Sequence, residues 1–169
     1  MKLRRTALFP IAMIATFSSV SCVQIYRGAQ DIALRELSVR TENFARDFEY
    51  DEAVASLNLA IGLAPRIPEL YVLRGQMYLN LYEWDKSLED YNTAIDLAPV
   101  YAEAYFQRGV LYYSILQTGQ SLREEALADF RHYLDLAPGG EYALQAADYA
   151  GKIEAELAAL NEQRQRDNP

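Results

Sequence analysis

The sequence predicts an all-α protein: an α-solenoid of about three stacked helical hairpins, closed by a C-terminal capping helix. Two observations lead to this prediction. The tripeptide Leu-Ala-Pro occurs three times, ending at Pro65, Pro99 and Pro138, so the repeat is 34 residues long and its last copy is five residues longer. In each copy, apolar residues recur three and four positions apart in two blocks, which is the pattern of two amphipathic helices.

The period divides the chain into one helical domain, residues 34–163, and a polar tail, residues 164–169. The three repeats and the capping helix are expected at about residues 34–67, 68–101, 102–140 and 141–163. One hairpin cannot bury its apolar face alone, whereas stacked hairpins share a continuous core. The last helix is expected to cover the open end of the stack, since apolar residues alternate with charges along it: Tyr142, Leu144, Ala147, Ile153 and Leu157.

The second repeat shows the hairpin most clearly. Pro68 and Glu69 suit the first turn of a helix, because a missing N–H costs nothing there and a carboxylate faces the positive end of the dipole. Helices are predicted over residues 68–80 and 85–97, and Pro99 prevents the second from continuing. The corresponding breaks in the other repeats are expected near residues 48–50 and 114–122. The second of these breaks contains the insertion, for which a neutral surface loop and a partner contact both remain open.

A shared pattern of large and small residues precedes each Leu-Ala-Pro. The second copy reads Tyr71-x2-Arg74-Gly75-x2-Tyr78, then Ser87-x3-Tyr91 and Ala94; the third reads Tyr105-x2-Arg108-Gly109-x2-Tyr112, then Ala126-x3-Phe130. The first is the most degenerate, with Leu37-x2-Arg40-Thr41-x2-Phe44 and Ala53-x3-Leu57. From residue 34 to about 138, the chain resembles the tetratricopeptide repeat (TPR) family.

Two departures from the family pattern are informative. Arg40, Arg74 and Arg108 stand where the family usually has Leu, and Thr41 replaces the first glycine. The family's glycine lies where the two helices of one repeat pack closely, so a looser first hairpin is expected.

The N-terminus resembles a secretory signal peptide, predicted over residues 1–21. Lys2, Arg4 and Arg5 precede an apolar run over residues 7–17, and small residues follow. The run is about half the length of a membrane span, so a cleaved signal is favoured over an uncleaved anchor. Residues 22–33 would then be the mature segment that leads into the first helix.

Cys22 is the only cysteine, and it stands where the apolar run gives way to small residues, as in the lipobox of bacterial lipoproteins. The resemblance implies a lipid on its sulfur and a membrane-anchored protein of the cell envelope. The fit is imperfect, because Ser19 stands where the family usually has Leu. Ordinary secretion into the periplasm or medium after cleavage at Ser19-Val20-Ser21, or an incidental buried cysteine, remain alternatives.

The mature chain is acidic. Removing the three basic residues of the signal leaves 13 basic and 24 acidic residues, a formal charge of −11. Such a field repels phosphate backbones and anionic lipids, so nucleic-acid binding is not expected and membrane attachment would come from acyl chains. The simpler interpretation is that the excess of acidic residues keeps the protein soluble.

No catalytic, cofactor or metal site is predicted. His132 is the sole histidine, and a single helical histidine is most often a surface residue. Glu124, Glu125 and Asp129 have helical spacing, which is typical of a solvated face. The sequence holds no cluster of histidines and cysteines for a metal and no glycine-rich loop for a phosphate.

The TPR resemblance implies a concave groove lined by the first helix of each hairpin. The matching residues are Arg35, Ser38, Glu42, Ala45, Glu69, Val72, Gln76, Leu79, Glu103, Phe106, Val110, Tyr113, Tyr142 and Tyr149. Such a groove would be polar near the first repeat and aromatic near the last, which suits a peptide or helix with apolar anchors.

For Phe106, Val110 and Tyr113, exposure in the groove and burial under the cap or the insertion are both open. One family subset binds the C-terminal carboxylates of chaperones through a Lys, Asn and Arg clamp. Ser38, Glu42 and Val72 stand at clamp positions here, so that activity is not expected.

The function predicted from the sequence is a non-enzymatic, lipid-anchored adaptor that binds a protein or peptide in an envelope-assembly, secretion or peptidoglycan-processing complex. Two alternatives belong to other classes. One is a small extracytoplasmic enzyme with its site in the groove, and the other is a structural protein that self-associates through its aromatic end.

Overall fold

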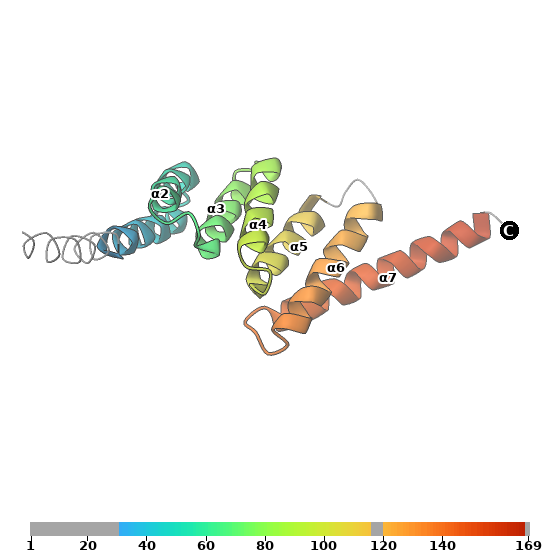
Figure 1. Ribbon diagram of the computed structural model, residues 1–169. Helices are drawn as coiled ribbons and strands as arrows, with labels where there is room; N and C mark the ends of the chain where they lie inside the picture. The colour runs from blue at the N-terminus through green and yellow to red at the C-terminus, as the bar shows by residue number, and fades with distance from the viewer. Residues whose placement is uncertain (1–30, 116–119, 168–169) are drawn as a thin grey trace, which may run out of the picture.

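The computed structural model describes residues 31–115 and 120–167, and every regular element in this part of the chain is helical. Residues 31–46 form a helix, and six further helices follow it. These are α2 (Tyr50–Leu63), α3 (Pro68–Asn80), α4 (Trp84–Leu97), α5 (Ala102–Ile115), α6 (Gln120–Leu136) and α7 (Ala143–Asp167). Figure 1 shows the helices side by side in chain order. The prediction of an all-α solenoid is confirmed.

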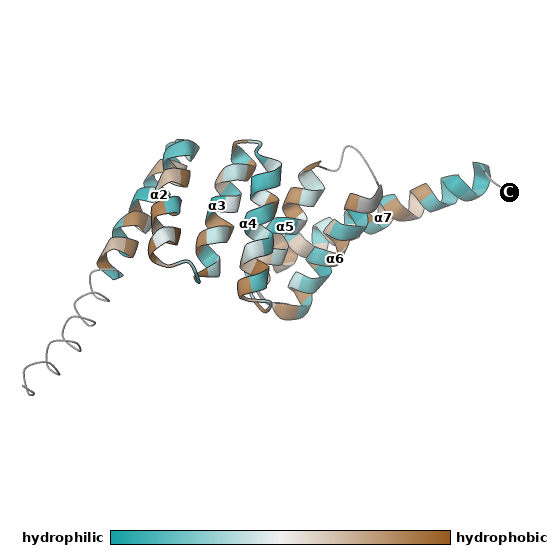
Figure 2. Ribbon diagram, turned by 45° about the horizontal axis from the view of Figure 1, so that its top comes forward, coloured by the Kyte–Doolittle hydropathy of each residue, from teal (hydrophilic) through white to brown (hydrophobic). Residues whose placement is uncertain are grey.

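The helices pair into three hairpins: residues 31–46 with α2, α3 with α4, and α5 with α6. Each helix from α2 onward packs on its neighbours in the sequence, and the first helices of successive hairpins, α3 and α5, also touch. Such nearest-neighbour packing is the defining property of a solenoid. Figure 2 shows that hydrophobic and hydrophilic residues alternate along the described helices.

Three buried clusters form the core, and each bridges a hairpin and the helix that follows it. The first joins residues 31–46, α2 and α3 through Leu37, Ala53, Leu57, Ala60, Leu70 and Met77. The second joins α3, α4 and α5 through Val72, Tyr91, Ala94, Ala104 and Leu111. The third joins α5, α6 and α7 through Phe106, Ala126, Leu127, Phe130, Tyr133, Ala146, Ala150 and Ile153. Stacking therefore buries apolar surface that a single hairpin would expose.

The Leu-Ala-Pro tripeptides end the second helices. Ala64 and Ala98 leave the helical region, with φ of −139° and −145°, while their N–H groups still donate to the carbonyls four residues back at 2.9 and 3.0 Å. The next residue is a proline, which has no N–H with which to extend the helix. Helix α3 has the bounds expected from the sequence, and α4 begins one residue earlier than expected.

Close approach of the two helices in the second and third hairpins depends on glycine. A Cβ placed on Gly75 would lie 2.6 Å from the ring of Tyr91, and one on Gly109 would lie 3.0 Å from the ring of Phe130. Both rings are fully buried. The aromatic ring occupies the volume that the glycine leaves empty, so the pair works as one packing unit.

Helix α7 closes the stack but is longer than predicted. It covers the third cluster with Ala146, Ala150 and Ile153 and is tied to α6 by the ion pairs Arg123–Glu156 (2.9 Å) and Arg131–Glu154 (2.8 Å). The predicted polar tail continues this helix up to Asp167. Figure 1 shows the C-terminal part of α7 projecting beyond the other helices.

The predicted signal segment, Cys22 and most of the segment over residues 22–33 lie outside the described residues. Among the residues that are described, no helix has both the length and the apolar character needed to cross a membrane.

Candidate partner-binding groove

A cavity of about 280 Å³ opens between the helix over residues 31–46 and α3, and α2 forms its floor. We call it the groove pocket; it is lined by Leu37, Ser38, Thr41, Glu42, Ala45, Leu57, Ala60, Leu70, Leu73, Gln76 and Met77. Its floor consists of the buried residues of the first core cluster, so the lining is mainly apolar. The pocket therefore provides an apolar recess between the first helices of two successive hairpins.

The polar groups of the groove pocket differ in whether they are free to bind a ligand. The hydroxyls of Ser38 and Thr41 each donate to a carbonyl of their own helix at 2.9 Å. Glu42 is exposed, and within residues 31–115 and 120–167 no hydrogen bond or ion pair engages its carboxylate. The carboxylate of Glu42 is thus the charge that the pocket offers to a ligand.

Four residues that the sequence predicted for the groove meet in this pocket: Ser38, Glu42, Ala45 and Gln76. Arg35 and Glu69 are exposed one or two helical turns away on the same two helices. Leu79 packs instead against the second core cluster. The structure thus brings together half of the eight positions predicted in the first two hairpins.

Val72 and Phe106 are corrections to the predicted groove. Val72 is 1% exposed and belongs to the second core cluster. Phe106 is 3% exposed, and the Tyr142 ring stacks on it with centroids 4.4 Å apart. Neither side chain is accessible to a partner, because the superhelical packing turns these positions towards the next helix.

The aromatic end of the predicted groove packs against α7, to which Tyr149 itself belongs. Val110, Tyr113 and Tyr149 are partly buried against the third core cluster, and the rings of Tyr113 and Tyr149 contact each other at 4.8 Å. The Tyr149 ring also stacks on Phe130 at 5.1 Å. The predicted aromatic end of the groove is thus only partly accessible, and the apolar recess lies at the first two hairpins.

Carboxylates lie near Tyr101, just before α5. The Tyr101 hydroxyl donates to Glu103 at 2.9 Å. Burial, this hydrogen bond and the charges of Glu103 and Glu69 all raise the pKa of Tyr101. Burial and the charges of Glu103 and Glu141 likewise raise the pKa of Tyr142. The charge of Glu103 thus acts on both phenols, which stand in the connections before α5 and α7.

Two of the three arginines at the family's Leu position, Arg74 and Arg108, form bridges that were not predicted from the sequence. Arg74 makes two hydrogen bonds to Asp90 (2.9 and 2.6 Å) and one to Asn58 of the preceding hairpin (2.6 Å). Arg108 repeats this arrangement with Asp129 (2.8 Å twice) and Asn92 (2.7 Å). We call these the arginine bridges. The sequence does contain a signal for them: the second and third repeats each have this arginine in the first helix and an aspartate in the second helix.

The arginine bridges join partly buried charges. The hydrogen bond to Asp90 raises the pKa of Arg74, and Asp129 has the same effect on Arg108. Asp129, expected on a solvated face, is instead 5% exposed and paired, which is a second correction. Each bridge ties a hairpin internally and to the hairpin before it, so these charges serve the stack.

The described residues hold no group of three His, Cys, Asp or Glu side chains placed to bind a metal ion. His132 is exposed, and its ring lies 4.2 Å from that of Tyr105.

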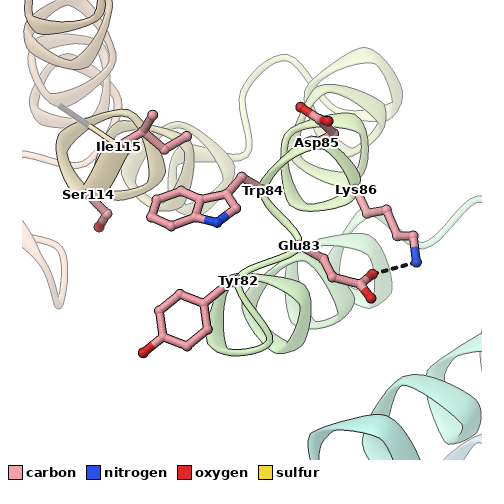
Figure 3. Close-up of a pocket in the computed structure, with 7 residues that line it drawn as sticks. All are labelled: Tyr82, Glu83, Trp84, Asp85, Lys86, Ser114 and Ile115. Atoms are coloured by element: carbon pink, nitrogen blue, oxygen red, sulfur yellow. Dashed lines mark ion pairs between the residues drawn. The ribbon is translucent and has the colours of Figure 1, made fainter. Parts of the chain in front are cut away.

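A second hollow, of about 890 Å³, lies at the edge of the stack where the helices of the second hairpin turn. It is open and is lined by Tyr82, Glu83, Trp84, Asp85, Lys86, Ser114 and Ile115. In Figure 3 the Trp84 ring lies towards Ile115, and Lys86 pairs with Glu83 at 2.5 Å. Phe48 and Tyr82 occupy equivalent turn positions with φ of 64° and 60°, and both rings are about three-quarters exposed.

Comparison with known proteins supports the prediction of helical repeats. The family model described as TPR repeat matches residues 83–115, which span α4 and α5. No curated protein sequence matches the chain significantly.

Solved structures match much more of the chain. The first TPR of Spaghetti (RPAP3), bound to the HSP90 peptide SRMEEVD, is 26% identical, with a TM-score of 0.66 over 74% of this chain and 95% of that one. The first TPR domain of human RPAP3 is 25% identical, with a TM-score of 0.65 over 76% and 95%. The TPR2B domain of yeast Sti1, in its pHsp70 complex, is 16% identical with a TM-score of 0.66 over 74% and 98%, a likeness of fold alone. The described part of this chain is therefore an α-solenoid of helical hairpins with a fold similar to that of TPR domains.

Proposed function

We propose that this chain is a non-enzymatic adaptor that binds a segment of a partner protein in its concave groove. The observation that carries the proposal is the groove pocket, an apolar recess at the junction of two stacked hairpins. An apolar recess with a charged rim is the arrangement that anchors one side chain of an extended or helical peptide. The structurally similar RPAP3 domain was determined with a peptide bound, which agrees with a binding role.

The proposal includes export across the cytoplasmic membrane and a lipid on Cys22, with the adaptor acting in an envelope-assembly or secretion complex. The signal pattern and the position of Cys22 in the sequence support this part. Labelling cells with a fatty-acid analogue should mark the wild-type protein but not Cys22→Ala. Equal labelling of both proteins would remove the lipid anchor from the proposal.

Site-specific photo-crosslinking in the native envelope tests the groove directly. A photoreactive residue in place of Gln76, which lines the groove pocket, should capture one defined protein. The matched control carries the same residue at Glu89, which is exposed on α4. Capture of the same protein with equal yield from both positions would contradict binding in the groove, because it would report proximity alone.

A further inference from the structure

We infer that the groove pocket selects a cationic peptide segment, one apolar side chain flanked by lysine or arginine, rather than an acidic C-terminal segment. The inference rests on the proposed function and specifies its ligand. It follows from what lies in the recess and from the charges around it.

The recess accepts an apolar side chain. Its floor is formed by Leu37, Leu57, Ala60, Leu70 and Met77, all less than a tenth exposed. The hydroxyls of Ser38 and Thr41 are already engaged with their own helix, so they offer a ligand no free donor. A polar side chain inserted here would lose hydration without full replacement of its hydrogen bonds, whereas a leucine or methionine side chain would gain by burial.

The one charged side chain that lines the recess is the carboxylate of Glu42, and further carboxylates stand at predicted groove positions of α3 and α5. Of the predicted groove positions that carry a charge, three are carboxylates (Glu42, Glu69 and Glu103) and one is the guanidinium of Arg35. Glu69 and Glu103 occupy equivalent positions of α3 and α5, and the Tyr101 hydroxyl donates to Glu103 at 2.9 Å. Glu42 borders the recess itself. Charges of a ligand next to its anchor would therefore meet a negative field.

The same carboxylates disfavour acidic peptides. SRMEEVD, the peptide bound in the structurally similar Spaghetti (RPAP3) domain, carries three carboxylate side chains. In this chain such a segment would bring carboxylates against Glu42 and Glu69, and like charges placed together at an interface oppose binding. The two grooves thus share a backbone plan but differ in the charge that they accept.

The test is a titration of the purified full chain with three fluorescent nonapeptides that share a central leucine and differ in flanking residues: lysine and arginine, glutamate and aspartate, or serine. Fluorescence anisotropy should show the basic peptide binding at least about tenfold tighter than the acidic one at low salt, with the ratio falling as salt is raised. Replacing the central leucine by serine should abolish binding of the basic peptide.

Variants locate the preference. Glu42→Gln with Glu69→Gln should weaken the basic peptide about tenfold and leave the serine-flanked peptide unchanged. The matched control, Glu89→Gln with Asp96→Asn, removes the same charge from exposed positions of α4 and should bind like wild type. Equal or tighter binding of the acidic peptide would overturn the cationic selectivity while peptide binding stands. If none of the three peptides binds at millimolar concentration, both the selectivity and the proposed recess fail.

Discussion

The first and second hairpins have the same backbone plan but different interiors. In the second hairpin, Gly75 leaves room for the large ring of Tyr91, and Arg74 is paired with a buried carboxylate. In the first hairpin the equivalent positions hold Thr41 and Leu57, and Ser56 stands where the second has Asp90. The groove pocket borders Thr41 and Leu57. The degenerate repeat is thus the one that provides the recess.

This difference separates two uses of one repeat. In the second and third hairpins, the inner positions form ring-to-glycine contacts and arginine bridges. These interactions hold the stacked helices together. The first hairpin lacks the ring, and a smaller leucine leaves space beside Thr41 that the next helix does not fill. Along the solenoid, the regularly packed hairpins fill this space with an aromatic ring, whereas the less regular first hairpin leaves it open to a ligand.

The largest expected effect comes from breaking an arginine bridge. Arg74→Ala leaves Asp90, which is 3% exposed, without its countercharge, and should lower the free energy of unfolding by about 3 kcal/mol. Urea unfolding followed by circular dichroism measures this. Ser56→Ala, at the position equivalent to Asp90 in the first hairpin, is the control and should cost less than about 1 kcal/mol. Similar losses for both variants would show that the bridges are not what distinguishes the hairpins.

A smaller loss is expected when the ring-to-glycine contact is crowded. Gly75→Ala places a methyl group 2.6 Å from the Tyr91 ring, and should cost about 1–2 kcal/mol after the gain in helix propensity is counted. Gly109→Ala should cost less, because its nearest ring atom is 3.0 Å away. In thermal unfolding, Tyr91→Leu should partly rescue Gly75→Ala by recreating the space found in the first hairpin. Additive losses in the double variant would contradict this coupling.

Removing the backbone strain at Tyr82 should raise the free energy of unfolding by about 1 kcal/mol. The residue has φ of 60°, which is costly for a side chain with a Cβ, and its ring is 75% exposed. Tyr82→Gly is therefore expected to raise the melting temperature, and Phe48→Gly should do the same at the equivalent turn of the first hairpin. A fall in the melting temperature of both variants would mean that the exposed rings stabilise their turns more than the backbone strain costs.

The smallest effect concerns alkaline pH. Burial raises the pKa of Tyr91 above its ordinary value near 10, so the folded protein keeps this proton where the unfolded chain loses it. Stability from this group is complete below pH 10 and declines as the pH rises above it. Tyr91→Phe, which copies Phe130 of the third hairpin, should remove less than about 1 kcal/mol of that decline at pH 10.5. Identical pH profiles for wild type and variant would show that Tyr91 ionises as freely when folded.

Much of the fold followed from the sequence because it depends on local periodicity. The prolines of Leu-Ala-Pro and the spacing of apolar residues predicted the hairpins and the bounds of α3. The full length of α7 could not be predicted from the sequence, because a charged tail can extend a helix that is already anchored by packing.

The groove was only partly predictable, because its lining depends on how hairpins rotate against each other. Ser38, Glu42, Ala45 and Gln76 line the pocket as the family resemblance implied. The rotation instead buries Val72 and Phe106. Empty space left little trace in the sequence: Leu57 stands where the other repeats have an aromatic residue, and Thr41 stands in place of glycine.

The most direct test of the central claim is to fill the recess by giving the first hairpin the interior of the second. Thr41→Gly with Leu57→Tyr copies the Gly75–Tyr91 pair into the hairpin that borders the groove pocket. The variant should keep its helical content and melting temperature, yet bind the leucine-centred basic peptide at least about tenfold more weakly in the anisotropy titration. Unchanged affinity in a variant that remains folded would contradict the account, because the peptide would then bind without the recess.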